Sequence, residues 1–192
     1  MMKKMMMALL MAIIATSAGA QSAEKLYEEG KRLYDEKNYV EAYPKLRAAA
    51  EKGHKKAQYR VGRCYDKGHA VEEDDKQAFE WYLKSANQGF PKAQYQVGKF
   101  YKDGKGGVEK DRKTAVAYFA KAARQDNADG QYALGKAYMK GKGIAADQKK
   151  AKSWLKKAVK NEKDGKAIRK DIEKDAANGK DDAKQLKEMM KK

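Results

Sequence analysis

The chain has 192 residues and a net charge of +17, from 44 Lys or Arg and 27 Asp or Glu residues. Charged residues make up 37% of the sequence and proline occurs only twice, a composition that favours helices. Cys64 is the only cysteine, which excludes an internal disulfide, so packing must hold the fold together. We expect Cys64 to be a small buried core residue rather than a reactive thiol.

Residues 1–20 have the layout of a secretory signal peptide. They contain, in order, a basic start at Lys3 and Lys4, an uncharged apolar run over residues 5–15 and a small-residue cleavage site at residues 18–20. The apolar run is shorter than the roughly 20 residues of a membrane span, and a retained membrane anchor is the alternative. No later segment is apolar enough to cross a bilayer. We expect an exported protein, periplasmic or secreted, with no transmembrane segment; loss of the two lysines lowers the net charge from +17 to +15.

Residues 21–56 predict a first pair of helices. The first helix contains Leu26-Tyr27-x-x-Gly30, and the second opens at Asn38 and ends near Gly53. This pattern resembles an ordinary tetratricopeptide repeat, which is a helix–loop–helix unit.

A longer block of residues then occurs three times, at steps of 36 and 37 residues. The copies read Ala57-Gln58-Tyr59-x-Val61-Gly62-x-x-Tyr65-x-x-Gly68, Ala93-Gln94-Tyr95-x-Val97-Gly98-x-x-Tyr101-x-x-Gly104 and Gly130-Gln131-Tyr132-x-Leu134-Gly135-x-x-Tyr138-x-x-Gly141. A period of this length indicates stacked helical repeats rather than a single globular core. The three repeats span residues 57–92, 93–129 and 130–165.

Each repeat predicts a helix A, a loop and a helix B. In the first copy, Ala57, Val61 and Tyr65 form one stripe along helix A. A glycine inside a helix costs about 1 kcal/mol relative to alanine, so a glycine kept there in every copy indicates close contact between helices. This glycine is Gly62, Gly98 or Gly135, and a second glycine, expected to form a left-handed cap, follows the helix at Gly68, Gly104 or Gly141.

The loops and the second helices also correspond between the copies. We expect an apolar loop residue to fill the gap between the helices and an aspartate to cap helix B. These residues are Val71 and Asp74, Val108 and Asp111, and Ile144 and Asp147. Helix B then alternates a large aromatic residue with small residues, as close helix packing requires.

The pattern fades after Asn161. Residues 166–192 carry only two weak apolar stripes, one of Ile168, Ile172 and Ala176 and one of Leu186, Met189 and Met190. No aromatic residue follows Trp154, so we expect these last helices to bury little and to form a polar terminal cap.

The repeated pattern resembles that of the Sel-one-like repeat (SLR) family, a branch of the tetratricopeptide-type helical repeats. The resemblance covers residues 57–162. It implies an all-α fold, a right-handed α-solenoid with a concave surface and a C-terminal helical cap, and a role as scaffold or adaptor in protein complexes. One secreted branch of the family has paired cysteines in each repeat and is linked to β-lactam binding or hydrolysis; this chain lacks those cysteines.

A tyrosine and a cation one turn later recur on the face of helix A opposite the packed stripe. The four pairs are Tyr27 and Lys31, Tyr59 and Arg63, Tyr95 and Lys99, and Tyr132 and Lys136. Since this face lines the concave groove in tetratricopeptide-like stacks, the pairs predict a site for an extended or helical peptide, with cations favouring an acidic partner. Alternatively, the tyrosines pack against neighbouring helices and the cations are ordinary solvated surface.

No catalytic residue, cofactor or metal site is predicted. Ser153-x-x-Lys156 resembles the serine–lysine pair of penicillin-recognising enzymes, but the S-D-N and K-T-G elements are absent. His54 and His69 lie in predicted turns without partners at metal-ligand spacing. The glycine-rich loops do not lead into G-K-(S/T), as a phosphate-binding loop would.

We therefore expect a non-enzymatic, exported interaction module whose partner is a protein. Export argues against nucleic acid as a partner, as does the positive charge, which we interpret as spread over all units. A separate hypothesis is weak electrostatic contact with anionic surfaces. The competing functions are a secreted enzyme that binds or hydrolyses β-lactams and a secreted factor that contacts a host.

Overall fold

The structure is a computed structural model that describes residues 22–162 and 164–191. Within these residues every regular element is a helix, as the sequence predicts. None of the described helices is long and apolar enough to cross a membrane. The predicted signal peptide, residues 1–20, lies outside the described residues.

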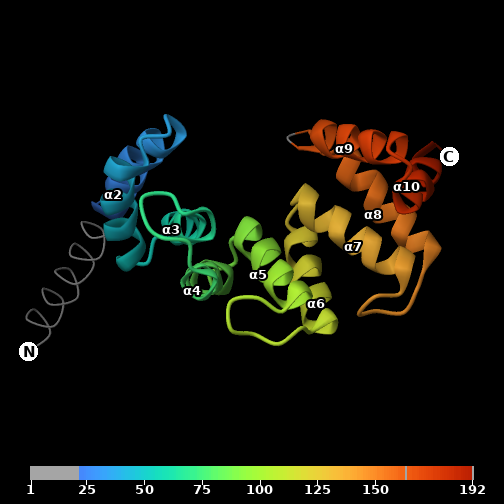
Figure 1. The fold of residues 1–192 in the computed structure, drawn as a ribbon, viewed down its shortest axis with the longest axis horizontal. Helices are drawn as coiled ribbons and strands as arrows, with labels where there is room; N and C mark the ends of the chain where they lie inside the picture. Colours follow the sequence, from blue (N-terminus) through green and yellow to red (C-terminus); the bar gives the residue numbers. More distant parts are fainter. Residues whose placement is uncertain (1–21, 163, 192) are drawn as a thin grey trace, which may run out of the picture. The chain divides into compact units, whose positions relative to one another are not determined.

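The chain divides into two compact units, and the boundary along the sequence falls between Gln88 and Gly89. The first contains a helix over residues 22–35, α2 (Tyr39–Glu51), α3 (Lys55–Lys67) and α4 (Asp75–Asn87) (Figure 1). The second contains α5 (Pro91–Asp103), α6 (Arg112–Arg124), α7 (Ala128–Lys140), α8 (Gln148–Lys160), α9 (Gly165–Ala177) and α10 (Asp181–Lys191). The three longer repeats correspond to α3 with α4, α5 with α6 and α7 with α8.

The two helices of each repeat approach each other at the glycine inside helix A. A Cβ atom on Gly98 would lie 2.6 Å from the ring of Phe119, which is closer than real Cβ atoms come to other heavy atoms. The equivalent distances are 2.7 Å from Gly62 to Tyr82 and 2.7 Å from Gly135 to Leu155. The predicted close contact is therefore confirmed in all three repeats.

The predicted caps are also confirmed. Asp74 and Asp111 each accept hydrogen bonds from two backbone amides at the start of helix B, and Asp147 accepts one. The glycines after helix A adopt left-handed backbones, with φ of 62° at Gly68, 70° at Gly104 and 62° at Gly141. Each helix pair thus has the same two caps, an aspartate at the start of helix B and a left-handed glycine after helix A.

The terminal helices bury more than the sequence suggests. Ile172 of α9 and Leu186 of α10 are each only 1% exposed. They belong to an apolar cluster with Leu155 of α8, and α9 and α10 both pack against α8. The expectation that these helices bury little is wrong, because branched aliphatic side chains fill the interface without an aromatic residue.

A buried glutamine joins the end of helix B to helix A in the first two repeats. Gln88 Nε2 donates to Gln58 Oε1 at 2.8 Å, and Gln125 Nε2 donates to Gln94 Oε1 at the same distance. In the third repeat the donor position holds the shorter Asn161, which donates to the backbone oxygen of Asp126 instead. Gln131 Oε1 is consequently buried with no hydrogen-bond partner in the described part of the chain.

Candidate functional site

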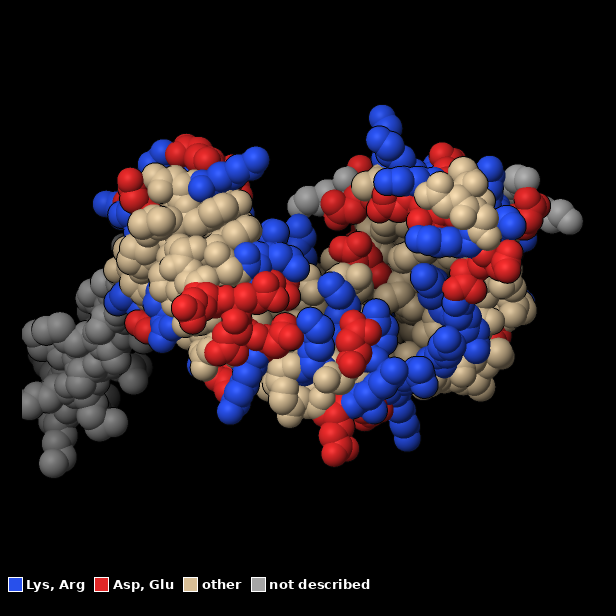
Figure 2. Space-filling view, viewed as in Figure 1, with Lys and Arg blue, Asp and Glu red and all other residues tan. Residues whose placement is uncertain are grey.

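The second unit contains a cleft of about 350 Å³ between α5, α6 and α7. Its lining is strongly basic. The described cations that line it are Lys99, Lys102, Lys110, Arg112, Lys136, Lys140 and Lys142, and the one acidic residue among the described lining residues is Asp103. Figure 2 shows Lys and Arg gathered around this hollow.

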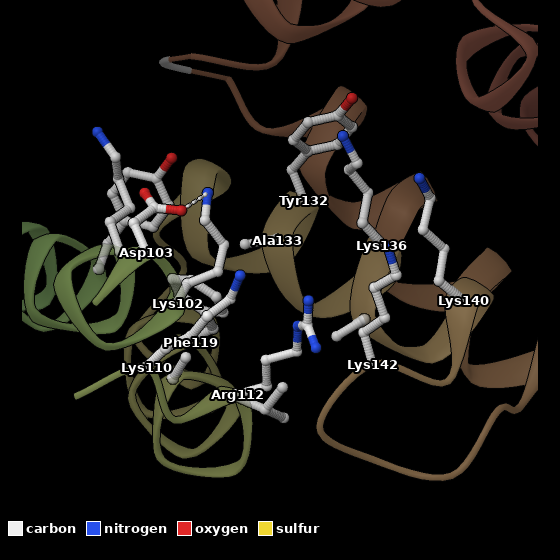
Figure 3. A pocket seen from close by; sticks show the side chains of 15 residues that line it. Lys102, Asp103, Lys110, Arg112, Phe119, Tyr132, Ala133, Lys136, Lys140 and Lys142 are labelled. Carbon is white, nitrogen blue, oxygen red and sulfur yellow. Dashed lines mark ion pairs between the residues drawn. The ribbon is translucent and has the colours of Figure 1, made fainter. Parts of the chain in front are cut away.

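The cations come from two banks with an apolar floor between them. Figure 3 shows Lys102 and Lys110 on one side and Lys136, Lys140 and Lys142 on the other, with Arg112 reaching between them. The floor consists of Ala115, Val116 and Phe119 of α6, which are buried. The first bank is α5 with the loop that follows it, and the second is α7 with its own following loop.

Most of these cations make no ion pair. Lys102 is 3.4 Å from the carboxylate of its neighbour Asp103, and Lys140 pairs with Asp182 of α10. No ion pair joins the other five lining cations to a described residue; they are Lys99, Lys110, Arg112, Lys136 and Lys142. The cleft therefore carries an excess of positive charge that a bound anion would balance.

Two tyrosine–cation pairs lie within the cleft. The Nζ atom of Lys99 lies 5.9 Å from the ring centre of Tyr95, and that of Lys136 lies 5.2 Å from the ring centre of Tyr132. Both distances are within the range of a cation–π contact, which leaves the ammonium group able to meet an anion from the other side.

The environment of Lys136 favours an anionic neighbour. Burial, followed by the positive charge of Lys102, lowers the pKa of Lys136 below its usual value, although Asp175 of α9 acts in the opposite direction. Burial also raises the pKa of Tyr132 to about 12, with a further contribution from Asp175. A carboxylate next to Lys136 would relieve the repulsion between the cations, and the protonated hydroxyl of Tyr132 is a hydrogen-bond donor at neutral pH.

The structure brings together four of the eight residues that the sequence predicts for the groove. Tyr95, Lys99, Tyr132 and Lys136 line the cleft of the second unit. The other four belong to the first unit and do not line it; they are Tyr27, Lys31, Tyr59 and Arg63.

In the first unit, the pairs have other neighbours. Tyr27 is 5% exposed and stacks on His54, with 4.2 Å between the ring centres. Lys31 lies 3.9 Å from Glu28 and 3.8 Å from Asp35 on its own helix. For Tyr27, therefore, packing accounts for the position.

The two residues of the second pair of the first unit, Tyr59 and Arg63, contact different aromatic side chains. The ring of Tyr59 lies 5.6 Å from that of Tyr82 in α4. The guanidinium of Arg63 lies over Tyr34, 5.6 Å from its ring centre, rather than over Tyr59. The regular tyrosine–cation spacing thus produces different contacts in the two units, because the residues that surround it differ.

Five cations of the cleft were not predicted from sequence. Lys102 and Lys140 lie in the last turns of α5 and α7, Lys110 and Lys142 lie in the loops that follow these helices, and Arg112 is the first residue of α6. An alignment of the repeats would have indicated two of them, because Lys110 and Arg112 stand at positions where the first copy has the acids Glu73 and Asp75.

The positive charge is concentrated in the second unit. Residues 22–88 contain 14 basic and 13 acidic residues, a net charge of +1, whereas residues 89–192 contain 28 and 14, a net charge of +14. The interpretation that the charge is spread over all units is wrong, since the repeat pattern leaves surface positions free to differ in charge from copy to copy.

The residues with reactive side chains have structural roles. The side chain of His54 accepts a hydrogen bond from the backbone amide of Ala57 and so caps α3. His69 stacks on Tyr39, with 3.9 Å between the ring centres. Cys64 is fully buried, and this burial raises the pKa of its thiol to about 11. Within the described residues, no group of three or more His, Cys, Asp or Glu side chains is placed to hold a metal ion.

Taken with the repeated helix pairs, these features define an all-α helical-repeat protein whose second unit contains a strongly basic cleft. The model of the Sel1 repeat family matches residues 55–90, 91–127 and 128–162, and each match begins at the first residue of α3, α5 or α7. The chain belongs to the Sel1 repeat family. Among curated proteins, none matches the chain significantly.

Solved structures of similar proteins confirm the predicted solenoid class. A Sel1 repeat protein from Oxalobacter formigenes is 33% identical, over 85% of this chain and 69% of its own, with a TM-score of 0.68. A protective antigen of uropathogenic Escherichia coli with an SLR fold is 29% identical, with a TM-score of 0.71; the match covers 93% of this chain but only 40% of the antigen. Cysteine rich protein B of Helicobacter pylori, 21% identical over 74% of this chain and 96% of its own with a TM-score of 0.51, shares the fold alone.

Proposed function

We propose that the protein is a non-enzymatic interaction module and that the cleft of its second unit binds an acidic segment of a partner protein. The observation that carries this proposal is the set of five lining cations that make no ion pair with a described residue, beside the rings of Tyr95 and Tyr132. Repeat proteins of this class generally use such concave surfaces to bind other proteins.

The size and chemistry of the cleft suit a short peptide segment. A volume of about 350 Å³ accommodates a few side chains rather than a folded domain. The tyrosines offer flat contact area and hydroxyl groups, while the two basic banks attract carboxylates from both sides. The apolar floor of Val116 and Phe119 would contact the aliphatic part of a glutamate side chain.

The test measures binding of a fluorescent oligoglutamate peptide, with an oligoglutamine peptide of the same length as the uncharged comparison. The double variant Lys99→Glu with Lys136→Glu should weaken binding by at least about tenfold, because two attractions become repulsions. The control, Lys149→Glu with Lys160→Glu, makes the same change in net charge at two exposed positions of α8 outside the cleft. If a folded cleft variant binds as tightly as the unmodified protein, the proposal is wrong.

We also propose that residues 1–20 direct export. The basic start, short apolar run and small-residue site support this, and none of the described helices spans a membrane. N-terminal sequencing of the protein from an envelope fraction should give Gln21 as the first residue. Recovery of the full chain with its first residue in place would contradict export with cleavage.

The alternative of a β-lactam-processing enzyme has no specific support in this chain. It depends on a family branch with paired cysteines, whereas Cys64 is alone and buried. Incubation of the purified protein with a chromogenic cephalosporin separates the two functions, because the proposed module should leave the substrate intact.

A further inference from the structure

We propose that one occupant of the basic cleft is a second copy of this chain, which inserts the acidic run Glu72-Glu73-Asp74-Asp75 of its first unit. The inference rests on the proposed function, because it requires a cleft that accepts an acidic segment. It adds the identity of that segment and the consequence that the protein assembles head to tail.

Two side chains of the acidic run, those of Glu72 and Glu73, are free to meet a cation of another molecule. Glu72 and Glu73 are exposed, and neither makes an ion pair with any residue that the structure describes. Four acids in succession occur nowhere else in the sequence. The run thus resembles the ligand that the cleft requires: a short, dense group of carboxylates on the surface of a folded unit.

The run is also held in a fixed conformation. Asp74 accepts hydrogen bonds at 2.9 Å from the amides of Lys76 and Gln77, and its own amide donates to the carbonyl of Tyr65 at 3.0 Å. Val71, the residue directly before the run, packs against the core of the first unit. A segment that is already ordered loses little conformational entropy when it binds, which favours association.

The repeat register makes the two surfaces complementary. Glu73 and Asp75 align with Lys110 and Arg112, which are both in the lining of the cleft. Two positions of the aligned segment are therefore acidic in the first unit and basic in the second, whereas the other two, Glu72 and Asp74, align with the acids Glu109 and Asp111. A chain with both forms of the loop has two matching surfaces of opposite charge.

The charge distribution selects the orientation of the contact. Two second units, each with a net charge of +14, repel each other, whereas a first unit with a net charge of +1 approaches a second unit without this cost. The favoured contact therefore joins different surfaces on the two copies. Such a contact leaves one loop and one cleft unused, so that further copies add at either end or a ring closes.

The test is sedimentation velocity of residues 21–192 over a range of protein concentrations, at about 50 mM and about 500 mM salt. The average mass should rise with concentration at low salt and return to that of the monomer at high salt. Two charge-reversal variants should each remain monomeric. The loop variant is Glu72→Lys with Glu73→Lys, and the cleft variant is Lys136→Glu with Lys142→Glu.

An equimolar mixture of the two variants gives the sharpest readout. The loop variant keeps an intact cleft and the cleft variant keeps an intact loop, so the mixture should form dimers that cannot grow further. The control variant, Glu41→Lys with Glu80→Lys, reverses two exposed acids of the first unit outside the run and should assemble like the unmodified protein.

Three results would overturn the inference: an unmodified protein that stays monomeric at low salt, a loop variant that still assembles, or a mixture without dimers. Oligoglutamate binding separates this failure from that of the proposed function. A monomeric protein that binds the peptide refutes self-assembly alone, whereas a protein that binds no peptide at its cleft refutes both.

Discussion

The backbone carbonyl of Arg112 occupies the space in which Gly143 would carry a Cβ atom. Arg112 begins α6, and Gly143 lies in the loop after α7 with a left-handed φ of 80°. The contact joins the floor of the cleft to the bank that carries Lys142. Only glycine permits this approach, so the width of the cleft depends on a residue without a side chain.

Gly143→Ala should destabilise the second unit and weaken binding at the cleft. The left-handed backbone costs a residue with a Cβ atom about 1–2 kcal/mol, and displacement of the loop by the new methyl group costs about 1–3 kcal/mol more. Thermal unfolding and oligoglutamate affinity, measured on the same samples, check this prediction.

Gly107→Ala is the matched control for this change. Gly107 has nearly the same φ, 81°, in the corresponding loop, but no described heavy atom lies within 4 Å of the place that its Cβ atom would take. The variant should lose only the backbone contribution and keep peptide affinity. Equal losses in the two variants would show that the contact with Arg112 has no role in shaping the cleft.

Asn161→Gln should stabilise the protein. The longer side chain can supply the donor that Gln88 and Gln125 provide in the other repeats, and Gln131 Oε1 is a buried acceptor without a partner in the described residues. An unsatisfied buried polar group costs about 1–3 kcal/mol, so we expect a gain of about 1 kcal/mol in the free energy of unfolding.

Gln125→Asn makes the reverse exchange in the middle repeat. It shortens the donor that reaches Gln94, so it should lower the free energy of unfolding by about 1–3 kcal/mol. Chemical denaturation of both variants measures the two changes in the free energy of unfolding. If Asn161→Gln loses stability, the third repeat satisfies Gln131 by some other route.

Ionisation of Tyr34 should lower the stability of the first unit at high pH. Burial raises its pKa from about 10 in an unfolded chain to about 12 in the fold. Because the folded pKa is the higher one, the contribution to stability is complete below about pH 10 and decreases as the pH rises toward 12.

The variant Tyr34→Phe separates the effect of Tyr34 from that of the lysines that titrate in the same pH range, because the lysines are the same in both proteins. The stability difference between the unmodified protein and the variant should shrink steadily as the pH rises through this window. Thermal unfolding monitored by circular dichroism measures it. A difference that stays constant with pH would mean that Tyr34 ionises equally easily in both states.

Cys64 should react with a thiol reagent only after unfolding. Its side chain is fully buried, and burial raises the pKa of the thiol to about 11, so little thiolate exists near neutral pH. Absorbance of the released chromophore should show no reaction in buffer and one thiol per chain in denaturant. Equally fast labelling in both conditions would show that the helix pair of α3 and α4 opens readily.

The helix pairs could be predicted from sequence because local chemistry determines them. Gly98 predicts a close helix contact, Asp111 predicts a helix cap and Gly104 predicts a left-handed turn, and each of these depends on neighbours within one repeat. The terminal helices were underestimated because Ile172 and Leu186 pack without the aromatic residue that marks the other repeats.

The candidate site could be predicted only in part. The helical period places Tyr95 and Lys99 on one face, but it does not show that Lys31 makes ion pairs with carboxylates of its own helix while Lys99 makes no ion pair with a described residue. Nor does it show that Arg112, the first residue of α6, reaches into the same space as Lys136. Pairing between charges and the folding of loops depend on distances across the unit, which a period along the chain does not contain.

The two units differ greatly in net charge, so the protein is electrostatically asymmetric along its sequence. Near any extended anionic surface, the second unit would be attracted much more strongly than the nearly neutral first unit. Such attraction requires no recognition of a particular molecule, so it would concentrate the protein at the surface through its second unit, and the surface would compete with acidic peptides for the cations of the cleft.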